Sequence, residues 1–195
     1  LEGVERISKI VRAMKDFSHP GGEEKVPTDI NALADEYLRL AYHGLRAKDK
    51  SFNADFSLDA NEDLPKIKVV PQDIGRVLLN LINNAFYAVS EKSKQIPPPP
   101  PKGGTEKEVD HYKPLVTVST VSSKSPSGDL GVKITVKDNG NGINKNIVDK
   151  IFQPFFTTKP VGKGTGLGLP VCYGIITKMG GSLTFDSREN VGTTF

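Results

Sequence analysis

Two asparagines, Asn80 and Asn84, lie four residues apart in a mostly apolar stretch of the chain. Residues at this spacing share one face of a helix, and their apolar neighbours predict that this helix is largely buried. A buried amide without a partner costs about 1–3 kcal/mol. A cation bound to phosphate oxygens would be a partner for such an amide, since magnesium takes oxygen ligands and keeps several waters. The alternative is that both amides bond to backbone or water.

A turn of sequence Asp-Asn-Gly-Asn-Gly directly follows a predicted strand. The carboxylate of Asp138, at the end of that strand, can accept a hydrogen bond from an exocyclic amine such as that of adenine. Gly140 and Gly142 allow the backbone to pass close to a ligand and to adopt positive φ. Because the same letters are a strong turn signal, an ordinary loop is the alternative.

A glycine-rich segment directly precedes a predicted helix. Backbone N–H groups and the positive end of a helix dipole favour an anion there, so we predict phosphate binding. No Gly-Lys-Ser/Thr ends the segment, which excludes a Walker loop, and no strand–loop–helix unit frames it as in a Rossmann fingerprint. A flexible lid without a ligand is the alternative. The candidate residues are Gly162, Lys163, Gly164, Thr165, Gly166, Leu167 and Gly168.

Three phenylalanines precede this segment, at Phe152, Phe155 and Phe156. They could be core residues, or they could form the hinge of a mobile lid over a bound nucleotide. Thr158 and Lys159 follow them directly. Both side chains are placed to meet phosphates if such a lid closes.

Apolar residues at spacings of three and four mark the helices that must position these side chains. Thr28 is placed to cap one helix and Pro71 to open another. Gly180 and Gly181 end the last one. Helices are predicted over 1–18, from Thr28 to about Arg46, from Pro71 to about Lys92 and over 169–179, with a short one over 144–151.

Runs of alternating apolar and polar residues predict the strands, and two of these are joined by a Ser/Pro/Gly turn as a hairpin. Residues 93–113 contain five consecutive prolines and form an exposed loop, either a variable insertion or a docking segment for a proline-binding partner. Because helices and strands do not alternate strictly, we predict an α/β two-layer sandwich with a mixed sheet. Strands are predicted over 51–58, 67–70, 115–121, 132–137, 182–186 and 193–195, the last cut off by the end of the chain.

The overall composition excludes several classes of protein. The net charge is +3 with scattered basic residues, so we expect no nucleic-acid partner. No stretch approaches the roughly 20 apolar residues of a membrane helix, so we expect a cytoplasmic domain without membrane contact, whether or not a longer protein is anchored. The single cysteine, Cys172, excludes an internal disulfide and a cysteine-built zinc site. Its apolar surroundings predict a core residue.

In their order and spacing, the four motifs resemble those of the catalytic ATP-binding domain of sensor histidine kinases, a branch of the GHKL ATPase superfamily. The resemblance covers residues 28–195. It implies the Bergerat fold, with three main helices on a mixed sheet and ATP beneath a lid. Residues 1–18 resemble the end of the second helix of a dimerisation and phosphoacceptor hairpin, which leaves 19–27 as a linker.

The resemblance also implies a role for each motif. Asn84 would ligate Mg²⁺, and Asn80 would support the metal and phosphates, so both are expected to be catalytic. Asp138 would bind the adenine amine, helped through water by Thr193. The remaining residues expected around ATP are Gly140 and Gly142 at the base, and Thr158, Lys159, Gly162, Lys163, Gly164, Thr165, Gly166, Leu167 and Gly168 at the phosphates.

Asn80 separates the subclasses of this superfamily. ATP-hydrolysing relatives carry a glutamate base at this position, and an asparagine cannot act as one. We therefore expect transfer of the γ-phosphoryl group to a histidine, which needs mainly positioning and charge neutralisation. A GHKL ATPase, a serine kinase of the same fold and a non-catalytic interaction module are the alternatives. Pro170 departs from the family pattern, which more often has a small polar residue there.

None of the three histidines, His19, His43 and His111, matches the phosphoacceptor motif of the family. We therefore expect the acceptor histidine to lie on a hairpin outside this chain. The resemblance further implies onward transfer to the receiver domain of a response regulator, and a homodimer when the protein is full length. The kinase is thus expected to be incomplete in this chain.

Overall fold

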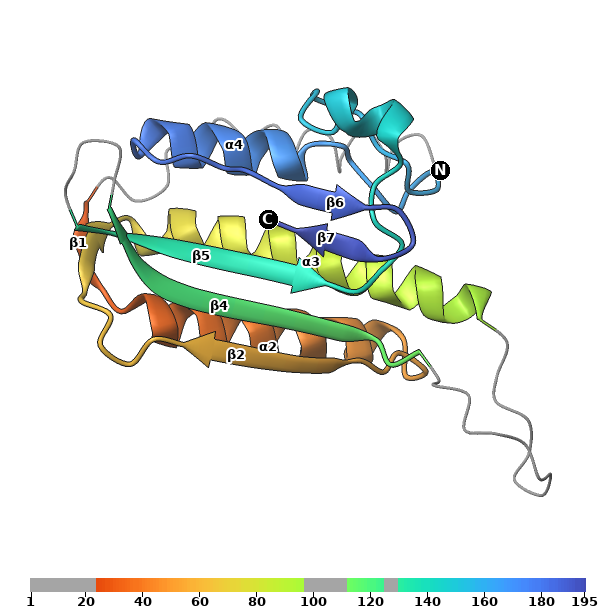
Figure 1. Cartoon of the computed structure of the whole chain (residues 1–195), viewed down its shortest axis with the longest axis horizontal. Helices are drawn as coiled ribbons and strands as arrows, with labels where there is room; N and C mark the ends of the chain where they lie inside the picture. The colour runs from red at the N-terminus through yellow and green to blue at the C-terminus, as the bar shows by residue number, and fades with distance from the viewer. Residues whose placement is uncertain (1–23, 97–111, 125–129) are drawn as a thin grey trace, which may run out of the picture.

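The computed structural model describes residues 24–96, 112–124 and 130–195 (Figure 1). It contains a five-stranded sheet of order β2-β4-β5-β7-β6. β2 pairs with β4 in parallel, and the other neighbours are antiparallel, so the sheet is mixed as predicted. The strands are β2 (Asp55–Ala60), β4 (Leu115–Lys124), β5 (Leu130–Asp138), β6 (Asp186–Arg188) and β7 (Gly192–Thr194).

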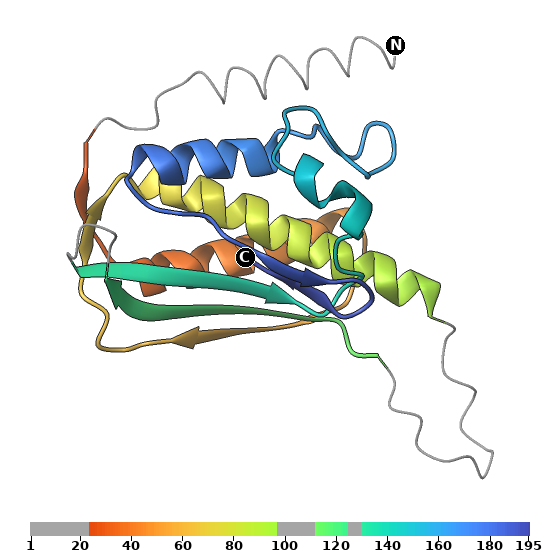
Figure 2. The same cartoon turned by 45° about the horizontal axis from the view of Figure 1, so that its top comes forward.

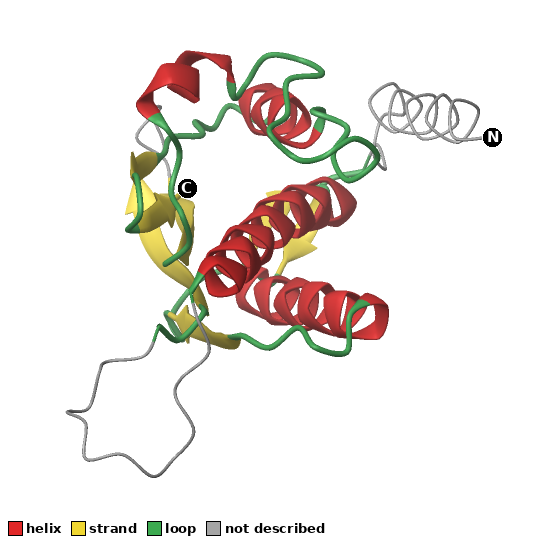
Figure 3. Ribbon diagram, turned by 90° about the vertical axis from the view of Figure 1, so that its right-hand side faces the viewer, coloured by secondary structure: helices red, strands yellow, loops and turns green. Residues whose placement is uncertain are grey.

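Three α-helices lie on one face of this sheet, which confirms the two-layer sandwich (Figures 2 and 3). They are α2 (Ile30–Lys48), α3 (Pro71–Gln95) and α4 (Gly168–Lys178). α3 lies between the other two and contacts both. The predicted helix over 1–18 and the central part of the proline-rich loop over 93–113 lie outside the described residues.

The start of α2 corrects one prediction. Asp29, not Thr28, is the N-cap, because its carboxylate accepts a hydrogen bond from the N–H of Ala32 at 3.0 Å. Thr28 instead ends β1 (Val26–Thr28), which pairs antiparallel with β3 (Ile67–Val69). The linker over 19–27 stays a prediction, although its last two residues belong to β1 through pairing with β3.

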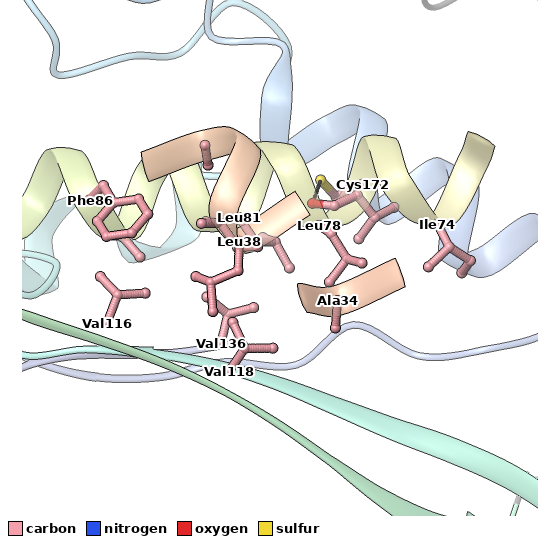
Figure 4. Packing of buried hydrophobic residues seen from close by; sticks show 14 of the residues in the cluster. Ala34, Leu38, Ile74, Leu78, Leu81, Phe86, Val116, Val118, Val136 and Cys172 are labelled. Atoms are coloured by element: carbon pink, nitrogen blue, oxygen red, sulfur yellow. Dashed lines mark hydrogen bonds between the residues drawn. The ribbon is translucent and has the colours of Figure 1, made fainter. Parts of the chain in front are cut away.

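The helix that carries both asparagines follows its prediction closely. α3 begins at Pro71, whose missing N–H costs nothing in a first helical turn. It ends three residues beyond the expected Lys92. Its buried face is almost wholly apolar and faces both α2 and the sheet (Figure 4). The buried residues are Ile74, Gly75, Val77, Leu78, Leu81, Ile82, Ala85, Phe86 and Val89.

Two strand predictions are corrected. The strand expected over 51–58 is β2, shifted to 55–60, because pairing with β4 begins only where Asp55 meets Leu115. The strand expected over 182–186 is wrong for its first four residues, and only Asp186 starts β6. Phe185 packs there against Phe152 and Phe195 rather than joining a ladder. The predicted hairpin of β4 and β5 is confirmed, and residues 145–150 form a short 3₁₀ helix, η1 (Lys145–Lys150).

Cys172 lies in the core between α3 and α4, as predicted (Figure 4). Its side chain is fully buried, and its thiol donates a weak hydrogen bond to the carbonyl of Val77 at 3.8 Å. Burial raises the pKa of this thiol to about 12. Within the described residues, every helix is too short or too polar to span a bilayer.

Candidate nucleotide-binding site

A cavity of about 390 Å³ lies between α3, the end of β5 and the loop that leads into α4. It collects residues from all four motifs, although they are spread over more than a hundred positions of the chain. Twelve of the predicted site residues line it: Asn80, Asn84, Asp138, Gly142, Thr158, Lys159, Lys163, Gly164, Thr165, Gly166, Gly168 and Thr193.

Three predicted site residues do not line the cavity. Gly140 packs against Ala88 of α3 and the side chain of Asp138. Gly162 lies in an exposed part of the loop over 155–168, which we call the lid, with no heavy atom within 4 Å of where a Cβ would stand. Leu167 is 5% exposed and caps the start of α4, so its side chain belongs to the core.

Asp138 is a carboxylate on the helix-facing side of β5. It follows Val136 at a spacing of two, and both side chains are buried against the helical layer. Its Oδ1 accepts hydrogen bonds from the N–H of Gly140 at 2.8 Å and of Thr193 at 3.3 Å. Burial raises its pKa to about 6, although these two hydrogen bonds and the charge of Lys92 oppose the increase. The carboxylate is thus ionised at neutral pH and faces the cavity.

The turn after Asp138 needs glycine at one position in particular. Gly142 has φ of 69°, and a Cβ there would lie 2.2 Å from the carbonyl oxygen of Arg188. The turn therefore packs directly on the β6–β7 connection. Ser187 in β6 completes this contact, because its hydroxyl accepts from the N–H of Ile143 at 2.9 Å and lies 2.9 Å from the hydroxyl of Thr193.

The other end of the cavity is formed by Asn80 and Asn84 on one face of α3. The Oδ1 of Asn84 accepts a hydrogen bond from the ammonium of Lys159 at 2.8 Å. That ammonium also lies 4.4 Å from the centre of the Tyr87 ring, a cation–π contact. Burial lowers the pKa of Lys159. The ammonium of Lys159 thus bonds to the amide oxygen of Asn84, which the sequence analysis expected to ligate a metal.

The phenylalanine motif connects to the glycine segment through the backbone. The N–H of Phe155 donates to the carbonyl of Gly166 at 2.9 Å. Both residues have positive φ, and a Cβ on Gly166 would lie 2.3 Å from the Phe155 carbonyl carbon. Phe155 is 52% exposed, whereas Phe156 lines the cavity and Phe152 packs against Tyr173. The motif therefore forms the base of the lid and not simply part of the core.

Several lining residues were missed by the sequence analysis. Tyr87 follows Asn84 by three residues, so helical spacing alone could have placed it on the same face. An apolar part of the lining comes from Ile143, Ile147 and Ile151, which lie in and around η1 and share no single helical face in the sequence. The other missed residues are Asn83, Ala85, Ala88, Phe156, Thr157, Leu169, Pro170 and Phe195.

The lining is poor in groups that bind metals unaided. Among the described residues, no three or more His, Cys, Asp or Glu side chains cluster as a metal site. Asp138 is the one carboxylate among the described residues that line the cavity. A cation here would therefore take most of its oxygen ligands from a bound anion and water, with amide oxygens such as that of Asn84 completing the set.

Comparisons with known proteins agree with this geometry. Residues 69–195 match the family model described as histidine kinase-, DNA gyrase B-, and HSP90-like ATPase. The chain is similar to the sensor histidine kinase ZraS of Escherichia coli K12, with 30% identity over 191 residues, which cover 98% of this chain and 34% of that protein. It is 34% identical over 201 residues to the sensor kinase CckA of Brucella abortus, covering all of this chain and 19% of that one.

A solved structure matches the fold as well. The catalytic domain of histidine kinase ThkA superposes with a TM-score of 0.56 at 29% identity, covering 83% of this chain and 89% of that one. This chain spans about a third or less of the length of ZraS and CckA.

Proposed function

Because this chain belongs to the family of histidine kinase-, DNA gyrase B- and HSP90-like ATPases, we propose that it is the ATP-binding catalytic domain of a sensor histidine kinase. It binds Mg·ATP and passes the γ-phosphoryl group to a histidine on a helical hairpin outside this chain. The observation that carries the proposal is one cavity in which the Asn80–Asn84 face of α3 stands opposite Asp138 beneath a glycine-rich lid.

At the end of the cavity that takes the base, called the base end below, Asp138 accepts a hydrogen bond from the exocyclic amine of adenine. Its Oδ1 already holds two backbone N–H groups, so the carboxylate is fixed in orientation before a ligand arrives. Thr193 is buried beside it, with its hydroxyl bonded to that of Ser187, and is placed to support a water between itself and the base. The apolar wall of Ile143, Ile147 and Ile151 shields the purine from bulk water.

At the phosphate end, the lid supplies N–H groups and cations. Gly164, Gly166 and Gly168 line the cavity at the start of α4, where unpaired helical N–H groups and the dipole favour an anion. Lys159, Lys163, Thr158 and Thr165 line the same end. Their charges and hydroxyls would neutralise and orient the phosphate chain.

The residues present fit one magnesium ion. The amide oxygen of Asn84 already accepts a cationic partner, the ammonium of Lys159, so it is a hard oxygen donor directed into the cavity. Asn84 would hold the metal, and Asn80, one turn earlier, would support it and the phosphates. When bound, Mg²⁺ supplies charge neutralisation for the phosphoryl group that is transferred.

Asn80 argues against the hydrolase alternative. A water molecule that attacks ATP needs a general base to take its proton, and neither asparagine can serve as one. The carboxylate of Asp138 lies at the adenine end of the cavity, away from the phosphates. The chemistry left to this chain is positioning: its residues hold the nucleotide and the metal while the acceptor histidine approaches. We further propose transfer from that histidine to a response regulator, dimerisation through the hairpin, and a cytoplasmic location.

The experiment that tests this function is a thermal melt with and without Mg²⁺ and a non-hydrolysable ATP analogue. A ligand at about 100 times its Kd stabilises the fold by about 2.7 kcal/mol. We expect that shift in the natural sequence and a much smaller one in Asp138→Asn and Asn84→Ala. With Mg·ATP in place of the analogue, supplying a histidine hairpin should then give phosphohistidine and ADP. Steady ATP hydrolysis without any hairpin would favour the ATPase, and a well-folded chain with no shift would favour an interaction module.

A further inference from the structure

The face of α3 that carries the two asparagines continues beyond them toward the base end. Asn80, Asn84, Ala88 and Lys92 follow one another at steps of four residues and form a row that winds slowly around the helix, by about 40° a step. Ala88 lines the cavity and touches the turn after Asp138, since a Cβ on Gly140 would lie 2.6 Å from that of Ala88. Lys92 is the next residue in this row, one turn beyond the cavity.

The ammonium of Lys92 binds three backbone carbonyls from two separate turns. It donates to the carbonyl of Asn139 at 2.9 Å, of Gly140 at 3.2 Å and of Asn190 at 2.9 Å. An ammonium has three donors, so all of them are engaged. Two of these carbonyls belong to the residues directly after Asp138, and the third belongs to the β6–β7 turn that leads to Thr193.

Tyr112 completes the surroundings of this ammonium. Its ring centre lies 4.8 Å from the Lys92 nitrogen, and its hydroxyl donates to the side-chain oxygen of Asn139 at 3.2 Å. The side chain of Asn139 is held further by the N–H of Leu115 at 2.9 Å and by the carbonyl of Lys113 at 2.8 Å. The first residue after Asp138 is thus fixed through its backbone by Lys92 and through its side chain by the start of β4.

One turn that Lys92 binds carries a donor to Asp138, and the other leads into the strand that carries the second donor. The N–H of Gly140 and the N–H of Thr193 both donate to the Oδ1 of Asp138. The turns also contact each other directly, because the N–H of Asn190 donates to the carbonyl of Asn141 at 2.7 Å. Displacement of the turn after Asp138 therefore moves one donor of the carboxylate directly, and displacement of the β6–β7 turn acts on the start of the strand that holds the other.

We propose that Lys92 is a positioning residue for base recognition, which binds the turns around Asp138 to α3 and so sets the place of that carboxylate relative to Asn84. Lys92 follows Asn84 by eight positions along the helix, a rise of about 12 Å. The single helix α3 thus carries Asn84, the amide proposed to bind the metal, near its centre. Near its end it carries Lys92, which supports Asp138, the carboxylate proposed to bind the base. This inference rests on the proposed function for the identity of the ligand.

The test compares Lys92→Met with the matched control Lys94→Met. Lys94 lies two residues further along the same helix end and forms an exposed pair with Glu91 at 2.9 Å, so both variants remove one positive charge from the same place. Each variant is titrated by calorimetry with Mg·ADP, which uses both ends of the cavity, and with Mg·tripolyphosphate, which uses only the phosphate end. Amide hydrogen exchange at Gly140 and Thr193 is measured in the free protein.

We expect Lys92→Met to lose about tenfold in affinity for Mg·ADP, because turns that Lys92 no longer holds must be ordered when the ligand binds. Its affinity for Mg·tripolyphosphate should change less than about twofold, and exchange at Gly140 and Thr193 should accelerate about tenfold. Lys94→Met should match the natural sequence in all three measurements. If Lys92→Met does not fold, Lys92→Gln, which retains a donor, should show the same pattern with smaller changes.

Two results would overturn the inference. Equal losses for Mg·ADP and Mg·tripolyphosphate would mean that Lys92 acts on the fold as a whole and not on the base end. Unchanged exchange at Gly140 and Thr193 would mean that the turns are held without it. Failure of the natural sequence to bind Mg·ADP would instead refute the proposed function, and the exchange result would then report only whether Lys92 holds the turns.

Discussion

Asp138 at one end of the cavity is 7% exposed, whereas Val161 on the lid at the other end is 83% exposed. The surroundings of Asp138 are paired strands and two turns joined by Lys92. The lid over 155–168 belongs to no sheet or helix until α4 begins at Gly168, and one bond from Phe155 to Gly166 closes its base. The base end is therefore assembled in the free protein, whereas fewer hydrogen bonds and no strand pairing hold the lid in place.

This difference suggests that the two ends of the cavity act at different stages of ligand binding. Preorganised groups bind a ligand without a further cost in conformational entropy, so the base end is suited to first recognition. A loop with few contacts can rearrange when a ligand supplies new ones. In the structure, the ammonium of Lys159 donates a hydrogen bond to Asn84. Under the proposed function, closing the lid on Mg·ATP would exchange this bond for contacts with the metal and phosphates.

The largest expected effect sharpens this contrast through two glycines. Gly142→Ala at the base end should destabilise the fold by about 3 kcal/mol, since positive φ costs about 1–2 kcal/mol and overpacking against Arg188 about 1–3 kcal/mol. Gly162→Ala in the lid also has positive φ but meets no atom within 4 Å, so only the backbone cost of about 1–2 kcal/mol should remain. Urea unfolding measures both. Equal losses would show that the lid is packed as firmly as the base end.

A second prediction concerns the cost of the buried carboxylate. The folded pKa of Asp138 is about 6, above its ordinary value of 3.8, so ionisation destabilises the fold. Asp138→Asn should therefore raise the free energy of unfolding by about 2 kcal/mol at pH 7.5, although it weakens nucleotide binding. The gain should be full above about pH 6 and vanish below about pH 4, where the natural carboxyl is protonated in both states. Urea unfolding at pH 7.5 and pH 4 checks the sign.

The same carboxylate should make nucleotide affinity depend on pH. Below about pH 6 the carboxyl of Asp138 in the free protein becomes protonated and loses its charge, and one oxygen becomes a donor that opposes the amine of the base. Affinity should therefore fall with the protonated fraction. An affinity that is flat between pH 5 and 8 would contradict the assignment of Asp138 to the base.

The smallest expected effect concerns the lid. Lys159→Met removes the bond to Asn84 and the contact with Tyr87, so the free lid should open more often. Chymotrypsin cleavage after Phe155 and Phe156 should accelerate several-fold, while the free energy of unfolding changes by less than about 1 kcal/mol. Lys163→Met, an exposed lid residue, is the matched control and should cleave at the natural rate. Cleavage of Lys159→Met at that rate would show that Lys159 does not hold the lid.

The sequence predicted best where the decisive forces are local. Pro71 at the start of α3, the spacing of Asn80 and Asn84, and the glycines before α4 carry their signals within a few residues. Thr28 and residues 182–185 were misjudged because partners far along the chain decide there: β3 recruits Thr28 into a strand, and aromatic packing takes Phe185 out of one.

Lys92 could not be found from the sequence for the same reason. Its partners, Asn139, Gly140 and Asn190, lie 47 to 98 residues away along the chain. A lysine near the end of a helix is ordinarily a solvated charge that favours the helix dipole. Only the fold brings three carbonyls to its ammonium, so its significance is a property of tertiary structure.

The burial of Cys172 has a practical consequence for anyone who wishes to follow the lid. The chain has one cysteine, and its thiol is both enclosed and held protonated, so thiol reagents should not modify the folded protein. A fluorophore or spin label attached through a cysteine at Val161 would therefore mark the lid alone. The native thiol becomes, in turn, a silent reporter that reacts only when the core opens.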